Sequence, residues 1–421
     1  MAEKLLALRY MTQFRCTGPL CEDPCCGGWN IFVDEPGYRR LELAAHRSPS
    51  LREQLDLSLE RPGPSGWFAK VRAHADGNCG FFEDGFCALH RDLGESVLPG
   101  TCATYPRTVA HVGNRCELSG TLSCPEAARL CLCEPDAMDL VEASWEMLPE
   151  HCLVTREVPH TESHYTGRFD QVRAVVLDLL GLEAYPLEER LFFVMYFSNQ
   201  TSSFFQRDRG ADPDSRLEQE IIRVKNRAFL AELARDFRCL RTSEEFALDV
   251  VFGLLQSSLD QERPRRYRAL CTGVLQSYGI QRFDQFADAA LREGIGAEYV
   301  RRRERAMKRF AGRIETILTR YAQNYWVREP YTQSPDLLSH TRDLVVRLAL
   351  VKFLFFSHPD LEMLLEEDET RHEPLDRIAI EVVQTFARNV EHDNAFLERA
   401  RNKLLSRGAT GLSHLSCLAR L

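Results

Sequence analysis

The sequence predicts a mainly α fold, in which an irregular, cysteine-rich metal-binding N-terminal module with short strands is docked on a helical C-terminal domain. Twelve of the fifteen cysteines lie at or before Cys152, and apolar residues recur at helical spacing from about residue 168 onward. A length of 421 residues with 44% apolar content allows two or three domains. We expect a cysteine-rich metal or iron–sulfur module over 1–135, a connection over 136–167 and a helical domain over 168–421 that docks the substrate.

The N-terminal module is organised around four cysteines that lie within eleven residues, at 16–26. Pro19, Pro24 and the pair Gly27-Gly28 bend the chain between and after them. Thiolates on so short a segment can converge on one metal ion or iron–sulfur cluster, because both prefer this soft ligand. Two disulfides, or four buried thiols without a ligand, are the alternatives.

Composition and the absence of export signals bear on these alternatives. The segment 1–9 has a short apolar run with no cleavage site, so we expect no secretory signal and a cytoplasmic location, where stable disulfides are rare. The longest apolar stretch, 344–356, contains Arg347 and Lys352 and is too short to span a membrane. A net charge of −9 argues against nucleic acid as a partner.

Four later cysteines have a glycine or proline within two residues, and turns of this kind can present a ligand at a sharp angle. The predicted metal ligands are therefore Cys16, Cys21, Cys25, Cys26, Cys79, Cys87, Cys102 and Cys124. Eight thiolates exceed the four ligands of one zinc ion or one [4Fe–4S] cluster, so there are two sites or some members lie outside the ligand shell. The chain has no CxxC knuckle, which favours an iron–sulfur cluster over zinc.

The remaining cysteines and the helical half have a simpler interpretation. Cys239, Cys271 and Cys417 lie in helical surroundings, where we expect core or incidental residues. Ser334 is the predicted N-cap of a buried helix that includes 337–356, and residues 200–215 are predicted to form a polar, mobile loop. Further amphipathic helices are predicted at 217–240 and 375–390.

Residues 10–130 resemble the flagellin lysine-N-methylase family, which lies within a wider group of zinc- or iron-chelating domains with a CxxCxxCC-type signature. The first part of the resemblance is Tyr10-x3-Phe14-x-Cys16, followed by Cys21-Glu22-Asp23-x-Cys25-Cys26-x-Gly28-Trp29-x-Ile31-x2-Asp34. The second part is Cys79-x-Phe81, Cys87-x2-His90, Gly94, Leu98, Cys102-x2-Tyr105-Pro106-Arg107 and Leu122-Ser123-Cys124-Pro125-Glu126. The spacing from Cys16 to Cys21 is wider than the CxxC of the group.

The resemblance implies a methyltransferase that modifies lysine ε-amines of flagellin, with S-adenosylmethionine as methyl donor and a cysteine-bound iron–sulfur cluster. Trp29 and the candidate catalytic residue Tyr105 either form walls for a cation or pack around the cluster. Arg107 either holds a carboxylate of the donor or pairs with an acidic residue of the protein. His90 is either a further metal ligand or a surface or capping residue.

Two other functions remain open from the sequence. A zinc- or iron-stabilised scaffold, which binds a partner protein or carries a metal, would need no catalysis, and a redox sensor would need reversible oxidation of its cysteines. The segment 175–183 contains only Gly181, whereas the cofactor loop of a Rossmann-type methyltransferase contains several glycines. We therefore expect a helix that ends at Gly181 and no donor site of that type.

Overall fold

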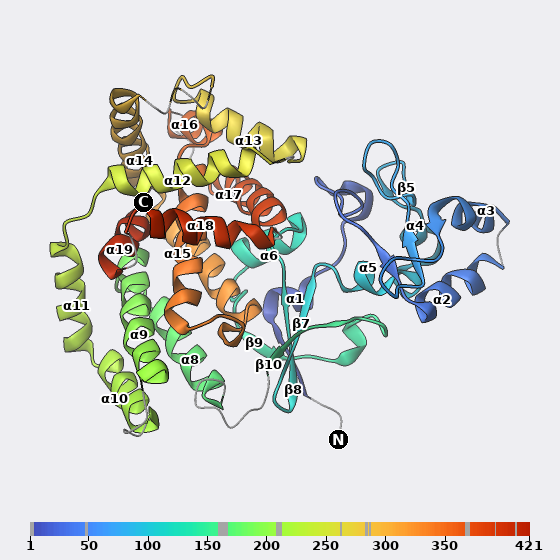
Figure 1. Cartoon of the computed structure of the whole chain (residues 1–421), viewed down its shortest axis with the longest axis horizontal. Helices are drawn as coiled ribbons and strands as arrows, with labels where there is room; N and C mark the ends of the chain where they lie inside the picture. Colours follow the sequence, from blue (N-terminus) through green and yellow to red (C-terminus); the bar gives the residue numbers. More distant parts are fainter. Residues whose placement is uncertain are drawn as a thin grey trace. The chain divides into compact units, whose positions relative to one another are not determined.

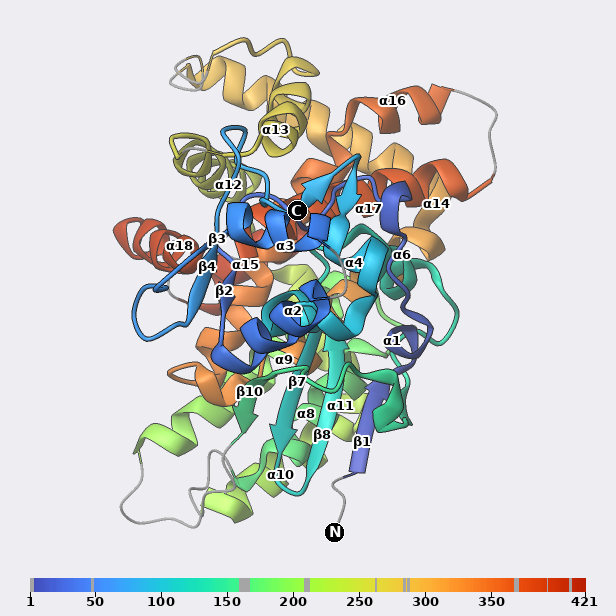
Figure 2. The same ribbon diagram turned by 90° about the vertical axis from the view of Figure 1, so that its right-hand side faces the viewer.

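The computed structural model divides the chain into two compact units, residues 1–157 and 158–421, each with its own core. Figures 1 and 2 show strands mainly in the first unit and helices throughout the second. The described residues are 4–46, 49–158, 167–207, 213–261, 263–282, 285, 288–366, 371–391, 393–408 and 411–421. The fold is mainly α, as the sequence predicts.

A five-stranded sheet forms one half of the first unit. Its strands are β1 (Lys4–Leu8), β7 (Arg107–Val112), β8 (Arg115–Gly120), β9 (Leu140–Glu142) and β10 (Val154–Val158), in the spatial order β10-β7-β8-β1-β9. Strand β1 pairs in parallel with β8, while β7 and β8 form an antiparallel hairpin. Strands β9 and β10 come from the stretch expected as a connection, of which residues 159–166 lie outside the described residues.

Two helices pack against each other next to this sheet, α1 (Arg9–Gln13) and α6 (Pro125–Cys133). The buried hydroxyl of Tyr10 accepts a hydrogen bond from the amide of Gly120 at 2.8 Å. It also donates a hydrogen bond to the carbonyl oxygen of Gly120 at 3.1 Å. These bonds tie the start of α1 to the end of β8. The first cysteine segment follows α1 along the chain, and Arg129 of α6 forms an ion pair with Glu22 of this segment.

The other half of the first unit consists of short elements. They are η1 (Gly18–Leu20), β2 (Phe32–Val33), α2 (Glu35–Ala45), α3 (Pro49–Ser58), β3 (Leu59–Glu60), β4 (Ala69–Val71), β5 (Phe82–Glu83), β6 (Phe86–Cys87), α4 (Ala88–Leu93), η2 (Glu95–Val97), α5 (Gly100–Thr104) and η3 (Trp145–Met147). A core cluster that includes Ile31, Leu41, Val71 and Phe81 holds these elements together. The predicted short strand at 29–33 is present as β2, which pairs with β4.

The second unit is helical throughout its described residues, apart from the end of β10. Its helices are α8 (Phe169–Leu180), α9 (Leu187–Arg207), α10 (Pro213–Lys225), α11 (Arg227–Cys239), α12 (Glu244–Leu259), α13 (Arg265–Gln276), α14 (Ala289–Arg328), η5 (Tyr331–Gln333), α15 (Leu337–Phe356), α16 (Pro359–Glu366), α17 (Glu373–Phe386), the π-helix η6 (Ala387–Glu391), α18 (Asn394–Ser406) and α19 (Leu412–Arg420). Helix α15 is buried and packs against α9, α14, α17 and α19. The prediction of a buried apolar helix at 337–356 is confirmed.

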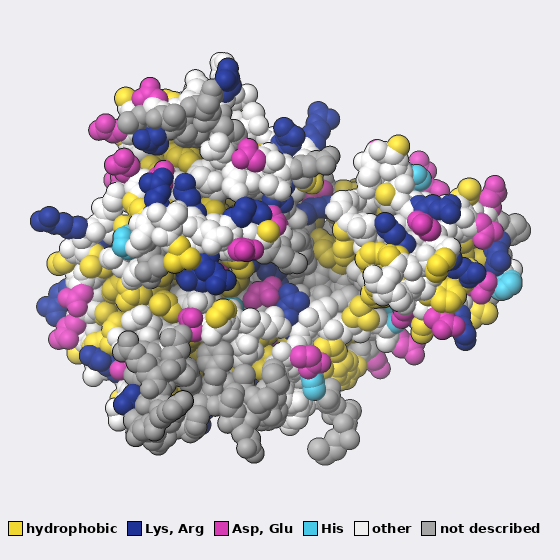
Figure 3. Space-filling view, in the orientation of Figure 1, with side chains coloured by type: hydrophobic (Ala, Val, Ile, Leu, Met, Phe, Trp, Pro, Cys, Tyr) yellow, Lys and Arg dark blue, Asp and Glu magenta, His cyan; other side chains and the backbone are white. Residues whose placement is uncertain are grey.

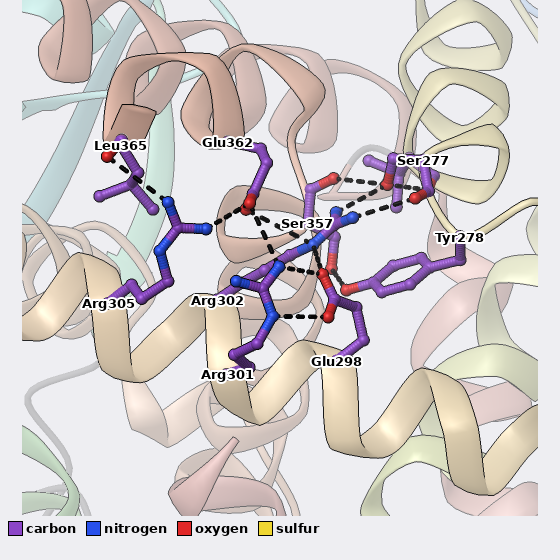
Figure 4. A network of polar contacts seen from close by, with 10 residues as sticks. Ser277, Tyr278, Glu298, Arg301, Arg302, Arg305, Ser357, Glu362 and Leu365 are labelled. Carbon is purple, nitrogen blue, oxygen red and sulfur yellow. Dashed lines mark hydrogen bonds and ion pairs between the residues drawn. The ribbon is translucent and has the colours of Figure 1, made fainter. Parts of the chain in front are cut away.

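A polar network connects four of these helices, as Figure 4 shows. Arg302 of α14 donates to the hydroxyl and the carbonyl oxygen of Ser277, at 2.9 Å each, and to Glu298 at 2.8 Å. Arg301 and Arg305, also of α14, bind Glu362 of α16. Of these three arginines only Arg302 is buried, and its oxygen partners offset the cost of taking its charge out of water.

Two local predictions in the helical half are wrong. The N-cap of α15 is Asp336 rather than Ser334, because the Asp336 carboxylate accepts from the amide of Ser339 at 2.7 Å. Residues 200–207 continue α9 and residues 213–215 begin α10, while 208–212 lie outside the described residues. The buried hydroxyl of Thr201 donates to the carbonyl oxygen of Phe197, so this polar residue is accommodated inside a helix.

Among the described residues, no helix is both long and apolar enough to cross a membrane. On the face that Figure 3 draws, acidic and basic side chains are interspersed.

Candidate metal centre

The first cysteine segment is held in shape by a tight turn and by pairing with a later loop. Gly18 has a φ of +60°, a left-handed conformation that glycine adopts without strain, and the amide of Cys21 then donates to the Gly18 carbonyl oxygen at 3.1 Å. Further along, the amide of Cys79 donates to the carbonyl oxygen of Cys26 at 2.7 Å. The second cysteine group is therefore fixed against the first by backbone hydrogen bonds.

The other cysteines of the predicted set are placed by short elements. The antiparallel pair β5 and β6 ends at Cys87, which is also the N-cap residue of α4. Cys102 lies on α5, and Cys124 is the N-cap residue of α6. A thiol at a helix N-terminus faces free backbone amides, which favour its thiolate form.

All eight predicted ligands line one cavity in the first unit. Its lining includes Cys16, Cys21, Cys25, Cys26, Cys79, Cys87, Cys102 and Cys124. Every one of these cysteines is a free thiol in the structure. The structure thus places all eight cysteines at one cavity, while their role as metal ligands and the identity of a bound metal stay predictions.

Three of the thiols that line the cavity are in contact, because Cys26 hydrogen-bonds with both Cys25 and Cys87. Among the described residues, no group of three or more His, Cys, Asp or Glu side chains is placed to hold a single metal ion.

Burial and mutual contact determine how these thiols ionise. Burial raises the pKa of Cys79 to about 11 and that of Cys124 to about 12. At Cys124, hydrogen bonds from the amides of Ala127 and Glu126 lower the pKa but only partly offset the effect of burial. Cys26 hydrogen-bonds with Cys25 and Cys87, which raises its own pKa, and its contact lowers the pKa of Cys87. A bound cation reverses the burial effect, because it stabilises thiolates directly.

Two aromatic side chains of the predicted site lie together at the cavity. Trp29 and Tyr105 both line it, with their ring centroids 5.7 Å apart. The indole Nε1 of Trp29 donates to the carbonyl oxygen of Cys25 at 2.6 Å, and the hydroxyl of Tyr105 is 3.1 Å from that of Ser123. Trp29 is 42% exposed, so its ring is accessible at the surface of the unit. Their roles as cation-binding walls or as packing around a cluster are both open.

Arg107 forms an ion pair with the carboxylate of Glu95. Its Nη1 donates to Glu95 at 2.6 Å and to the carbonyl oxygen of Ala103 at 2.9 Å, and its side chain is only 8% exposed. Arg107 does not line the cavity, whereas Glu95 does. The structure thus shows the ion pair, one of the two interactions expected for Arg107, and a role at a methyl donor stays a prediction.

Sequence reasoning did not single out several polar residues of the cavity. These residues are Asp23, Glu95 and Glu126. His90, which the sequence offered as a metal ligand or a surface residue, also lines the cavity, and its ring lies 5.2 Å from that of Phe86. Asp23 and Glu126 occur inside the cysteine motifs, so their spacing from a cysteine was the available signal. Glu95 follows Gly94 without a cysteine within five residues, and only the fold brings it to the site.

The cysteines outside the predicted set have other positions. Cys271 and Cys417 are buried in the helical unit and Cys239 is exposed there, in line with core or incidental roles. Cys131 is buried and Cys133 is half-buried at the end of α6. None of these five appears in the lining of the cavity.

The comparisons with known proteins give one family match and three similar proteins. Residues 173–418 match the FliB lysine N-methylase C-terminal domain, which amounts to more than half of the chain. Flagellar biosynthetic protein FliU of Salmonella muenchen is 30% identical over 156 residues, which are 37% of this chain and 91% of that protein. No solved structure matches.

Two proteins named lysine-N-methylase are also similar, one from Salmonella typhimurium and one from Salmonella choleraesuis. Each is 32% identical over 134 residues, which are 32% of this chain and 33% of the relative. The aligned region thus spans about a third of the length of these two enzymes.

Proposed function

The chain belongs to the FliB lysine N-methylase family, and from this premise we propose that it is a protein-lysine N-methyltransferase that methylates lysine ε-amines of flagellin. The names of the relatives support lysine as the modified residue and the flagellum as the setting. The observation that carries the proposed site is the single cavity lined by all eight predicted cysteines, Trp29 and Tyr105.

The proposal includes an iron–sulfur cluster, with [4Fe–4S] favoured over zinc. Thiolates are the ligands that such a cluster requires, and eight free thiols around one cavity supply more than it needs. A bound cluster with an open iron position would anchor the amino and carboxylate groups of the proposed donor, S-adenosylmethionine. Three of these eight cysteines would hold a cluster that keeps such an open iron, and the others would pack against it.

The residues of the chain would then bind and orient the reactants. The faces of Trp29 and Tyr105 attract the sulfonium of the donor or the ammonium of the lysine, since a cation over an aromatic ring is stabilised by about 1–2 kcal/mol when water is excluded. Transfer requires the lysine nitrogen to be neutral and to lie in line with the methyl group at about 3 Å. Tyr105 is our candidate for a residue in contact with the reacting groups, because its ring lines the cavity and pairs with Trp29.

The test combines metal analysis with an activity assay on the full chain. Protein purified without oxygen should contain iron and sulfide and show visible absorbance, and it should add methyl groups to flagellin lysines when S-adenosylmethionine is supplied, as detected by mass spectrometry. Failure to methylate in the presence of a complete cluster would argue against the enzyme. One colourless zinc ion per chain, without transfer, would favour a metal-stabilised binding scaffold instead.

A further inference from the structure

Carboxylates line the cavity, whereas the arginines that pair with two of them, Arg107 and Arg129, lie outside its lining. Apart from the thiols, its titratable side chains are Asp23, His90, Glu95, Glu126 and Tyr105. No Lys or Arg occurs among the described residues that line it. A cleft lined by charge of one sign concentrates ligands of the opposite sign, so this cavity suits a cation.

Glu95 differs from the other two carboxylates in how it is held. One of its oxygens accepts from Arg107, whose buried guanidinium also binds the carbonyl oxygen of Ala103 and lies 5.4 Å from the ring centre of Phe14. The Glu95 side chain is 38% exposed, against 8% for Arg107. Arg107 therefore lies behind the cavity wall and fixes a carboxylate that faces the cavity.

The second oxygen of Glu95 is available to a ligand. It has no hydrogen-bond partner among the described residues. An ionised carboxylate can accept about four hydrogen bonds in total, so the bond from Arg107 leaves room for more. Glu126, by contrast, binds Arg129, which also bridges to Glu22 on the surface of the unit.

A second hollow is lined partly by the same residues as the cavity, namely Cys16, Thr17, Gly18, Phe86 and His90. Pro19, Asp84 and Arg91 complete its lining. Cys16 is exposed and belongs to both linings, so the cavity borders the surface of the unit on this side.

We propose that Glu95 binds the ammonium group of the substrate lysine and that Arg107 is the positioning residue that orients this carboxylate. This inference rests on the proposed function. It assigns Arg107 to the acceptor side of the reaction rather than to the methyl donor. Glu95 binds the cation in the ground state, before the ammonium releases its proton to water and the neutral nitrogen attacks the methyl group. The loss of Glu95 should therefore raise KM more than it lowers kcat.

The first test is steady-state methylation of purified flagellin by the cluster-loaded full chain. Glu95→Gln keeps the shape of the side chain but removes its charge, and we expect KM for flagellin to rise about tenfold or more while kcat changes less than about threefold. Glu95→Asp should recover part of the loss. Glu83→Gln is the matched control, because Glu83 is a comparably exposed carboxylate of the same unit outside the cavity, and it should behave like the parent protein.

A second readout does not depend on docking of a whole protein. Butylammonium has the charge and length of the lysine side chain, and we expect it to inhibit the parent protein about tenfold more strongly than Glu95→Gln. Equal inhibition of both, or an unchanged KM in Glu95→Gln with intact cluster absorbance, would overturn the assignment. A parent protein that loads its cluster and methylates no flagellin would instead contradict the proposed function.

Arg107→Gln separates the two possible roles of the arginine. If Arg107 orients Glu95, KM for flagellin should rise several-fold while the Kd for S-adenosylmethionine, measured by calorimetry, stays within about twofold of the parent value. If Arg107 holds the donor carboxylate, the Kd should rise and KM for flagellin should stay unchanged. The second pattern would overturn the positioning role.

Discussion

Cys21 and Cys26 are the residues at which metal loading should be most sensitive to substitution. Both line the cavity, and Cys26 contacts the sulfur atoms of Cys25 and Cys87. We expect Cys21→Ser or Cys26→Ser to reduce the iron content sharply and to lower the melting temperature of the first unit, because metal binding and folding are linked. Iron analysis and thermal unfolding monitored by circular dichroism would measure both effects.

Cys239→Ser is the control for this experiment, since Cys239 is an exposed thiol of the helical unit. It should leave iron content and melting temperature unchanged. If its effect on iron equalled that of Cys21→Ser, the division of the cysteines into ligands and incidental residues would be wrong.

Glu391 is the residue on which a buried charge cluster of the helical unit depends. Burial by itself raises its pKa, but Arg328 and Arg347 outweigh this and lower the pKa to about 2. The carboxylate binds Arg328 and Tyr321, at 2.6 and 2.7 Å, and its side chain is only 4% exposed. Glu391→Gln removes the charge of the carboxylate that two buried arginines share, although Arg328 keeps its ion pair with Glu329. We expect a loss of about 3–5 kcal/mol in the free energy of unfolding at pH 7.

The pH dependence gives a second check on Glu391. A depressed pKa in the folded state contributes stability that is present above the unfolded value of about 4.3 and is lost as the pH falls toward 2. The difference between parent and Glu391→Gln in urea unfolding should therefore shrink below about pH 4. Glu398→Gln, an exposed change on α18, should show no difference at any pH.

At the residue scale, the sequence was informative where the chemistry has a recognisable side-chain type. A glycine or proline within two residues of a cysteine was the feature shared by all eight thiols that line the cavity. A cysteine in such a turn is typical of a metal ligand. Glu95 could not be found in this way, since glutamates occur throughout the chain and most of them are solvated. Only the pairing with Arg107 and the position at the cavity distinguish it.

Among the elements, η1 is the turn that most directly shapes the cysteine segment. Gly18 is buried with a φ of +60°, and a Cβ there would lie 3.6 Å from the ring of Phe86. The space is sufficient, so the cost of Gly18→Ala comes from the left-handed backbone and should be about 1–2 kcal/mol. We expect a lower melting temperature of the first unit and a faster loss of iron to a chelator.

Gly312→Ala is the matched change elsewhere in the chain. Gly312 lies inside α14, has an ordinary helical backbone and would meet no atom within 4 Å. Alanine is the better helix former, so this substitution should be neutral or slightly stabilising. Equal destabilisation by both substitutions would show that the turn at Gly18 has no special role.

Element by element, helices were predicted better than sheets. The apolar stretch at 337–356 and the repeat at 375–390 both form helices, because their periodicity is long and local. Strand β1 was not predicted, since it is five residues long and its parallel partner β8 lies more than 100 residues away. The N-cap of α15 has a different, local cause. Ser334 and Asp336 can both accept a capping hydrogen bond, and only the backbone geometry selects Asp336.

At the scale of the whole molecule, the boundary at residue 157 changes how the two halves can be separated. The sequence suggested a cysteine module that ends near residue 135, but β9 and β10 complete the sheet of the first unit beyond that point. A fragment of residues 1–158 retains all five strands, whereas a fragment of residues 1–137 lacks both strands at the edges of this sheet. The longer fragment should therefore be the more stable of the two.

We expect the fragment 1–158 to bind iron with the absorbance of the full chain, because every predicted ligand and the whole cavity lie within it. It should nevertheless fail to methylate flagellin, since the matched FliB lysine N-methylase C-terminal domain, at 173–418, is absent and recognition of a folded protein needs a large docking surface. Iron content, melting temperature and methyl transfer by the fragment and the full chain would be compared under one set of conditions. Methylation by the fragment at the rate of the full chain would show that the helical unit is dispensable, and the assignment of substrate docking to that unit would then be wrong.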